Sequence, residues 1–286
     1  MATADFEIID VHCHVVSPDR EKYPLAPIGG KQSDWSSSRP TTPEQLLAAM
    51  DAAGVSKAAV VQASTAYGHN SSYLADSIKR FPDRFTGVFS VDPLDPDALK
   101  HMDHWASLGM TGMRVFTTGS TMPGQQTWLD DERAYPVWEK AGAMKLPVAM
   151  QMTAEGIPLL LTLIKRFSQT NFLLDHLARP VINDGPPYAK AQSLWDLAQY
   201  KNVYLKLTSR TVEHCQQGNS TPEAFMTKLM QTFGSQRILW GSNFPAHDDT
   251  LPNIVKETLH VIASLSLADK ANVMSGTAKA LYPTLK

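Results

Sequence analysis

Apolar residues in this chain gather in short runs that are separated by segments with helical spacing. Eight runs are of strand type, rich in Val, Ile, Leu, Met or Phe. They occupy residues 7–11, 57–63, 86–91, 111–116, 147–152, 171–176, 203–208 and 237–241. Apolar positions at helical spacing predict helices between them, most clearly at 42–54, 71–81, 95–109, 132–145 and 221–234. Runs that are apolar on both faces are typical of parallel strands covered by helices.

The alternation predicts an α/β fold, a (β/α)8 TIM barrel. Such a barrel uses about 250 residues, and the chain has 286, which leaves a C-terminal helical tail. We therefore expect a single domain over residues 1–286. Residues 17–39, rich in Pro, Gly and Ser, predict a long loop after the first strand, over the barrel mouth. An open doubly wound sheet is the alternative, but the sequence has neither the dinucleotide glycine motif nor a P-loop.

Charge and composition narrow the expected partners. The 26 basic and 28 acidic residues are mixed along the chain and give a net charge of -2, so no basic stripe offers itself to nucleic acid or to an anionic membrane. No apolar run approaches the roughly 20 residues that span a bilayer. The first residues lack the layout of a secretion signal, and Cys13 and Cys215 lack metal-ligand spacing. We expect a cytoplasmic protein with a small-molecule substrate, and homo-oligomerisation stays open.

Polar residues stand where the apolar runs end, which is where a barrel places its chemistry. In "IIDVHCHV", His12 and His14 follow the first run, and residues i and i+2 of a strand point to the same side. Buried polar groups cost free energy unless they are paired, so a ring of them predicts a site. The other candidates at strand ends are Ser64, Arg114, Gln151, Asp175, His176, Lys206, Arg210, Asn243, His247 and Asp248.

Structural roles remain open for several of these residues. Asp175 could hold His176 as a satisfied core histidine. Arg114 could form an ion pair at the bottom of the barrel. The spacing does not say whether Lys206 faces inward or outward. Two further candidates could be satisfied polar groups or ligand contacts: Ser64 and Gln151.

Three motifs carry a resemblance to a known family. "DVHCH" after the first strand, "LLDHLARP" at the sixth and "ILWGSNFP" at the eighth resemble the amidohydrolase superfamily, within it the branch of 2-pyrone-4,6-dicarboxylate lactonase and related lactonases. "VVQAS" and "GMRVF" extend the resemblance, which runs from about Ile8 to the end. It implies a hydrolase that opens a lactone of a small, acidic intermediate of aromatic or sugar acid catabolism, with water attacking the carbonyl.

The same resemblance implies roles for individual residues. The strand-one histidines and His176 would polarise the lactone carbonyl or, in some relatives, hold a divalent metal. Arg114 and Ser64 match positions that grip a substrate carboxylate or a neighbouring oxygen. The expected catalytic residues are His12, His14, His176 and Asn243. The expected substrate contacts are Ser64, Arg114, Gln151, Arg210 and His247. No cofactor is required on this interpretation, and the alternative is a single zinc ion held by His12, His14 and His176.

The eighth strand departs from the family pattern at Asn243. Relatives carry Asp there, and that carboxylate takes a proton from the attacking water. An amide can orient water but cannot accept its proton. Either the chain belongs to a subgroup that uses Asn, or it carries an Asp-to-Asn change. Another base is then needed, and the candidates are His247, Asp248 and the strand-one histidines.

Two further departures bear on the substrate. Ser120 stands where the pyrone dicarboxylate enzyme has a second arginine, and Gln151 stands where it has a tyrosine. Without those groups a dicarboxylate is held less well, so we expect a lactone or ester with one acidic group, or a neutral one. The alternative functions are a metal-dependent decarboxylase or hydratase of the same superfamily, and a barrel that binds a small acid without turnover.

Overall fold

The computed structural model describes residues 5–286 and contains one eight-stranded parallel sheet whose strands are ordered as in the chain. The strands are β1 (Ile9–Cys13), β2 (Lys57–Val61), β3 (Phe85–Ser90), β4 (Met110–Phe116), β5 (Val148–Gln151), β6 (Phe172–Leu174), β7 (Val203–Thr208) and β8 (Ile238–Gly241). All eight expected strands are confirmed, and the fold is the expected single-domain (β/α)8 barrel. The predicted domain boundary at residue 1 lies outside the described residues.

The eighth strand returns to the first and closes the barrel. The backbone nitrogen of Asn243 donates to the carbonyl of His12 at 2.6 Å. Asp10, fully buried in β1, adds a side-chain bridge: its carboxylate accepts from the backbone nitrogen of Ser242 at 2.9 Å and from the Ser242 hydroxyl at 2.5 Å. Closure therefore places the residue after β8 beside the histidines of β1.

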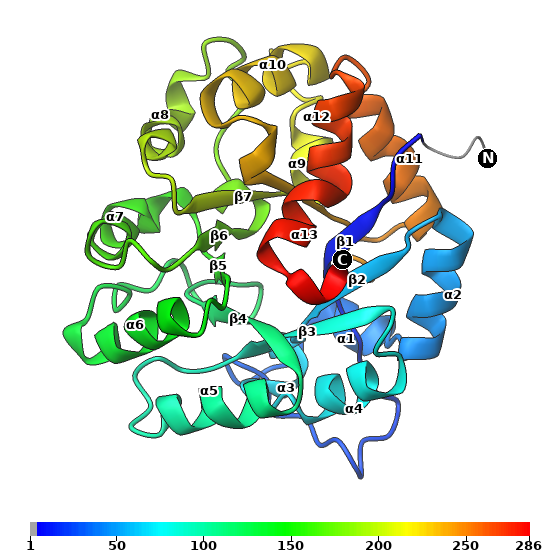
Figure 1. Ribbon diagram of the computed structural model, residues 1–286, viewed down its shortest axis with the longest axis vertical. Coiled ribbons are helices and arrows are strands. Elements are labelled where there is room, and N and C mark those ends of the chain that lie inside the picture. The colour runs from blue at the N-terminus through cyan, green and yellow to red at the C-terminus, as the bar shows by residue number, and fades with distance from the viewer. Residues whose placement is uncertain (1–4) are drawn as a thin grey trace.

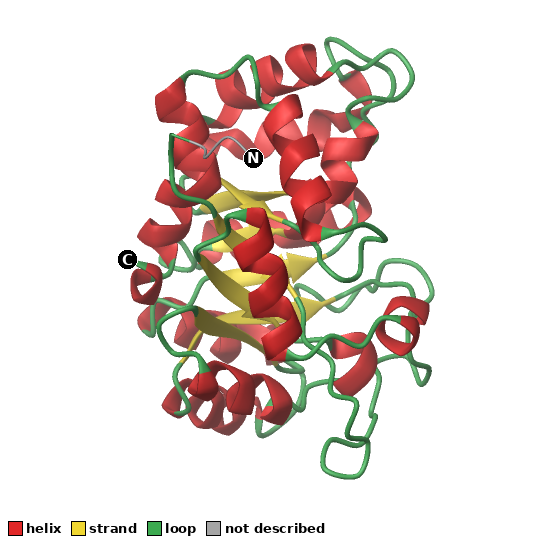
Figure 2. Cartoon of the chain, turned by 90° about the vertical axis from the view of Figure 1, so that its right-hand side faces the viewer, coloured by secondary structure: helices red, strands yellow, loops and turns green. Residues whose placement is uncertain are grey.

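Helices surround the strands on all sides (Figures 1 and 2). They are α1 (Asp34–Ser38), α2 (Pro43–Ala53), α3 (Ser64–Tyr67), α4 (Ser72–Arg80), α5 (Ala98–Ser107), α6 (Tyr135–Ala143), α7 (Ile157–Arg166), α8 (Gln192–Trp195), α9 (Ser209–His214), α10 (Pro222–Phe233), α11 (Leu251–Val261), α12 (Leu267–Ala271) and α13 (Thr277–Leu281). The five helices expected most clearly correspond to α2, α4, α5, α6 and α10. Thr42 and Gln45 form a capping box that begins α2, and Gly54 ends it with a φ of 73°. Within residues 5–286 no helix is long and apolar enough to cross a membrane.

The C-terminal tail seals the amino end of the barrel. Inward side chains of the strands pack against its last turns in one apolar cluster: Ile9, Val11, Ala59, Val61, Val88, Ala149, Leu173, Leu239, Ala278, Leu281, Tyr282 and Leu285. Tyr282 is fully buried. A Cβ on Gly112 would come within 2.8 Å of the Tyr282 ring, so a glycine is needed for this close approach. In Figure 1 α13 lies across this end of the strands.

Residues 17–39 form the expected loop over the opposite end, and α1 lies within it. The backbone nitrogen of Ile28 donates to the carbonyl of Ser64 at 3.0 Å. Arg39 donates from Nε to the carbonyl of Pro245 at 3.0 Å. The loop is therefore tied to the segments that follow both β2 and β8, and it covers the mouth between them.

Candidate active site

A cavity of about 180 Å³ lies at the carboxyl ends of the strands. The loop of residues 17–39 contributes Trp35 to its wall. Six of the residues expected from the sequence line it: His14, Ser64, Arg114, Gln151, His176 and Asn243. They come from six different strand ends, so the closed barrel brings together groups that are far apart in the chain.

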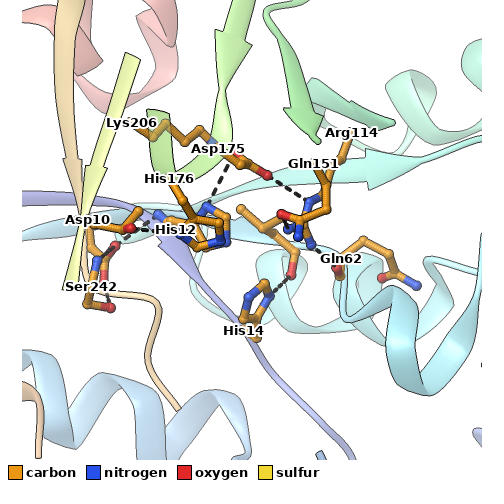
Figure 3. Close-up of polar contacts among 12 residues, drawn as sticks. Asp10, His12, His14, Gln62, Arg114, Gln151, Asp175, His176, Lys206 and Ser242 are labelled. Carbon is orange, nitrogen blue, oxygen red and sulfur yellow. Dashed lines mark hydrogen bonds and ion pairs between the residues drawn. The ribbon is translucent and has the colours of Figure 1, made fainter. Parts of the chain in front are cut away.

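The three histidines lie together (Figure 3). The His12 ring is fully buried, with its centroid 5.2 Å from that of His14 and 4.9 Å from that of His176. The register of β1 is irregular between Asp10 and Cys13, and His14 follows the last residue of the strand. The two β1 histidines therefore meet through an irregular strand end, whereas simple alternation along a strand was expected.

All three histidines are neutral at neutral pH because they are buried. Burial lowers the pKa of His12 to about 4, although Asp175 opposes the shift, and it lowers the pKa of His14 and His176 well below 6.5. Nδ1 of His14 lies 2.8 Å from the carbonyl of Val61. A carbonyl can only accept, so Nδ1 of His14 carries the hydrogen and Nε2 keeps a lone pair.

Asp175 is a buried hub for three neighbouring side chains (Figure 3). Its carboxylate lies 3.0 Å from Nε of Arg114, 3.1 Å from Nζ of Lys206 and 3.4 Å from Nδ1 of His12. Burial raises the pKa of Asp175, but these three neighbours outweigh it and hold the pKa well below its usual range. Lys206 is fully buried and faces inward.

The suggestion that Asp175 holds His176 is wrong. Nδ1 of His176 lies 2.7 Å from the hydroxyl of Thr208, at the end of β7. Asp175 and His176 are adjacent, but the chain turns sharply between them, so their side chains find partners in different places.

Arg114 lines the cavity and also forms an ion pair inside the barrel. Besides its contact with Asp175, its guanidinium donates to Oε1 of Gln151 at 3.0 Å, and only 4% of the residue is exposed. Its Nε already donates to Asp175, a carboxylate that Lys206 also contacts, and this ion pair weakens the attraction of Arg114 for a second carboxylate. Ser64 differs, because its buried Oγ has no hydrogen-bond partner in the described part of the chain.

Two expected substrate contacts do not line this cavity. Arg210 is exposed and lines a small hollow beside it, and His247 lines a separate hollow with Ser209. Asp248 is exposed and lies 3.2 Å from Arg39. Of the base candidates, His14 is therefore the one that lines the cavity. His12, expected as a catalytic residue, does not line it and is fully buried beside His14 and His176.

Two residues of the cavity wall, Trp35 and Arg179, were not among the site residues expected from the sequence. The centroid of the Trp35 ring lies 5.2 Å from that of the His14 ring, and the two ring planes are tilted by 31°. A tryptophan in a polar loop over the mouth was an available signal. Arg179 lies within the quoted motif "LLDHLARP" and follows His176 by three residues.

The turn that carries His176 and Arg179 has an unusual backbone. Four consecutive residues, His176 to Arg179, have φ between 52° and 58°. The left-handed conformation costs roughly 1–2 kcal/mol for each residue with a side chain. None of the four is Gly or Asn, so the sequence carried no sign of this turn, and the surrounding packing must hold it.

The three histidines do not form a ready metal site. No group of three or more His, Cys, Asp or Glu side chains in residues 5–286 is arranged to hold a metal ion. Asp175, the carboxylate that reaches His12, is already bound by Lys206 and Arg114. Those two cations also oppose a further positive charge nearby. As arranged, these residues do not fit the zinc ion considered from the sequence.

Comparison with known proteins supplies a family and one partial relative. The family model described as amidohydrolase (Amidohydro_2) matches residues 9–284. An L-fucono-1,5-lactonase of Burkholderia ambifaria is 28% identical over 119 residues, which are 41% of this chain and 41% of that protein. The chain thus matches less than half the length of this curated relative.

Solved structures share the fold over almost the whole chain. A probable 2-pyrone-4,6-dicarboxylic acid hydrolase from Acinetobacter baumannii, with citric acid bound, has a TM-score of 0.77 at 16% identity and covers 97% of this chain and 100% of its own. An amidohydrolase from Burkholderia multivorans with bound zinc has a TM-score of 0.76 at 18% identity, covering 97% and 99%. At these identities the likeness shows the fold. The family model spans nearly every residue of the barrel, and the chain belongs to the amidohydrolase family.

Proposed function

We propose that the protein is a lactonase, which opens the cyclic ester of a small lactone by attack of water on its carbonyl. The observation that carries the proposal is the cavity, which is lined by neutral His14 and His176 and by Ser64, whose hydroxyl has no hydrogen-bond partner among residues 5–286. The partial relative that is an L-fucono-1,5-lactonase supports the same reaction. We further propose a substrate with one acidic group, an intermediate of sugar or aromatic acid catabolism.

The cavity residues divide into donors and a proton acceptor. The Ser64 hydroxyl, with no other partner among residues 5–286, can donate to the lactone carbonyl. His176 can add a second donor when Thr208 donates to its Nδ1, because Nε2 then carries the hydrogen. A well-placed donor to a developing oxyanion is worth roughly 2.7–4 kcal/mol.

His14 is the proton acceptor in this proposal. Its Nε2 keeps a lone pair, so it can take the proton of the attacking water as the C–O bond forms. When the tetrahedral intermediate collapses, the ring C–O bond breaks and the leaving oxygen takes that proton from His14. The product is an open-chain hydroxy acid, and no other reactant is consumed.

Turnover of a lactone panel tests the proposal. Five- and six-membered lactones, each with and without a carboxylate, are followed by the acid that they release. We expect ring opening by the wild type and a loss of roughly 10²–10⁴ in kcat for His14→Asn. His101→Asn is the matched control and should keep full activity, because His101 is exposed on the surface of α5. A panel without any turnover, or a fully active His14→Asn variant, would contradict the proposal.

Metal content separates this proposal from the metal-dependent decarboxylase or hydratase. The protein is purified without added metal, analysed for its elements and assayed on the same panel before and after chelation. Lactone turnover that persists with substoichiometric metal supports a base among the histidines. Stoichiometric zinc, with turnover lost on chelation and regained on readdition, would favour the metal-dependent alternative.

A further inference from the structure

A second, smaller hollow adjoins the candidate active site. It shares the lining residues His176 and Arg179 with the main cavity, and its other charged or titratable lining residues are Arg210 and His214. Its free volume is about 10 Å³, which is room for roughly one water-sized group. Arg179 therefore stands between the place proposed for the lactone and a basic hollow beside it.

The charge of Arg179 is not balanced by the residues around it. Its buried Nε makes no hydrogen bond within residues 5–286, and unlike Arg114 it forms no salt bridge there. Burial, helped by the charges of Arg210 and Arg114 and opposed by Asp175, lowers the pKa of Arg179 to about 10. The group stays protonated at neutral pH. A buried cationic donor without an acceptor costs free energy, which an incoming anion would recover.

The two arginines of the cavity wall are thus unlike one another. Arg114 already has the Asp175 carboxylate at 3.0 Å and Oε1 of Gln151 at 3.0 Å. In the described part of the chain, Arg179 has neither a carboxylate nor an amide oxygen as a partner. An acidic substrate that enters the cavity meets Arg114, which already donates to Asp175 and Gln151. It also meets Arg179, whose Nε has no acceptor among residues 5–286.

We propose that Arg179, with Arg210 and His214 behind it, forms a carboxylate subsite that selects monoacidic substrates. This rests on the proposed lactonase function, because it names the charged group of that substrate. Arg114 then only forms part of the cavity wall, where Asp175 holds it in place. The small volume of the hollow suits one oxygen of a planar carboxylate better than a bulkier tetrahedral phosphate or sulfonate. The left-handed turn fixes His176 and Arg179 on the same cavity, so the carbonyl and the carboxylate would be held by one segment.

Binding of a lactam pair tests the subsite without requiring turnover. Pyroglutamate is a five-membered lactam with a carboxylate, and its carboxamide is a neutral match of the same size. Calorimetry measures both ligands on the wild type, on Arg179→Gln and on Arg133→Gln, a surface control whose partner is Asp131. We expect the wild type to prefer the acid, and Arg179→Gln to weaken binding of the acid about 10- to 100-fold without changing that of the amide. Arg133→Gln should match the wild type.

The possible outcomes distinguish failure of the proposed carboxylate subsite from failure of the proposed lactonase activity. Equal binding of acid and amide to the wild type, or equal loss of both in Arg179→Gln, would overturn the subsite. A phosphonate analogue that binds more tightly than pyroglutamate would overturn the assignment to carboxylates. If the acid depends on Arg179 as expected but no lactone on the panel is opened, the subsite stands as a small-acid site and the lactonase proposal fails alone. A thermal melt of each variant confirms that it is folded.

Discussion

The two ends of this barrel use the same eight strands but fill their interior in opposite ways. At the amino end Val11 and Leu173 pack against Tyr282 in an apolar cluster sealed by the C-terminal tail. At the carboxyl end the interior holds Asp175 and Lys206, both fully buried and paired with one another. The interior of the amino end is thus an apolar cluster, whereas the interior of the carboxyl end presents several polar and charged groups to the cavity.

The difference shows where stability and function are separated in the molecule. Burying apolar side chains stabilises the amino end directly. At the carboxyl end, pairing of buried charges at best offsets their desolvation, and the left-handed turn adds strain. Buried atoms without a hydrogen-bond partner among residues 5–286, such as Nε2 of His12 and Oγ of Ser64, also remain there. The mouth is therefore held in shape by the rest of the fold, and changes at the two ends should have separable effects.

The largest expected effect is on catalysis at the mouth, from Asn243→Asp. Asn243 lines the cavity with His14 and His176, and its backbone is fixed at a φ of 61° by closure of the barrel. A carboxylate there could accept the proton of the attacking water, which the amide of Asn243 cannot do. We expect kcat on the best lactone to rise roughly 10²–10⁴-fold. A fall in kcat would show that the added anion disturbs a histidine-based site, and that Asn243 is the residue the site requires.

At the amino end, Tyr282 tests stability without touching the site. Removing its buried ring in Tyr282→Ala should lower the free energy of unfolding by about 3–5 kcal/mol. Its hydroxyl is buried without a partner among residues 5–286, so Tyr282→Phe should be neutral or stabilising by about 1 kcal/mol. Denaturant unfolding measures both. Activity per folded molecule should equal that of the wild type, and a loss in Tyr282→Phe would show that the two ends are coupled.

Most of the architecture was open to prediction from the sequence. Strands and helices differ in the period of their apolar positions, so the eight strands and the main helices followed from pattern alone. The rule that barrels place chemistry at strand ends then selected six residues that share one cavity, although their roles stay predictions. The loop over the mouth followed from the break in periodicity.

What could not be predicted depends on geometry outside regular strands. Arg210 and His247 follow strand ends, but the segments after β7 and β8 direct them away from the main cavity. The inward direction of Lys206 could not be predicted, because alternation along β7 puts Lys206 on one face with Tyr204 and Thr208 but does not say which face points into the barrel. The left-handed turn brings Arg179 into the cavity wall, and it contains no Gly or Asn, the residues that usually indicate this conformation in a sequence. Each case turns on local backbone geometry that the apolar pattern does not encode.

Lowering the pH should reduce the stability of the protein through the buried groups at the carboxyl end of the barrel, and not through the apolar amino end. The pKa of His12 is about 4 in the fold and about 6.5 when unfolded. The unfolded chain therefore binds the proton first, and stability falls as the pH drops from about 6.5 to 4, by about 3 kcal/mol for this residue. Asp175, whose pKa is lowered, adds to this loss of stability only when the pH falls below its unfolded pKa of about 3.9. Denaturant midpoints at a series of pH values measure the slope. His101→Gln should keep it, and a flat profile would mean that His12 is protonated in the fold.

The smallest expected effect comes from relieving left-handed backbone strain, at one residue outside the mouth and at one residue within it. Lys145 is exposed after α6 and has a φ of 55°, while Ala178 is buried in the turn of His176 with a φ of 58°. Lys145→Gly should raise the free energy of unfolding by about 0.5–1 kcal/mol, because glycine removes the left-handed penalty but gains freedom when unfolded. Ala178→Gly relieves the same strain but loses a buried methyl group, so its stability should change by less than about 1 kcal/mol. Its effect should appear instead in kcat/KM, because the turn that positions His176 and Arg179 becomes freer to move. Equal activity of the two variants would mean that packing alone, and not the stiffness of the turn, positions the cavity wall.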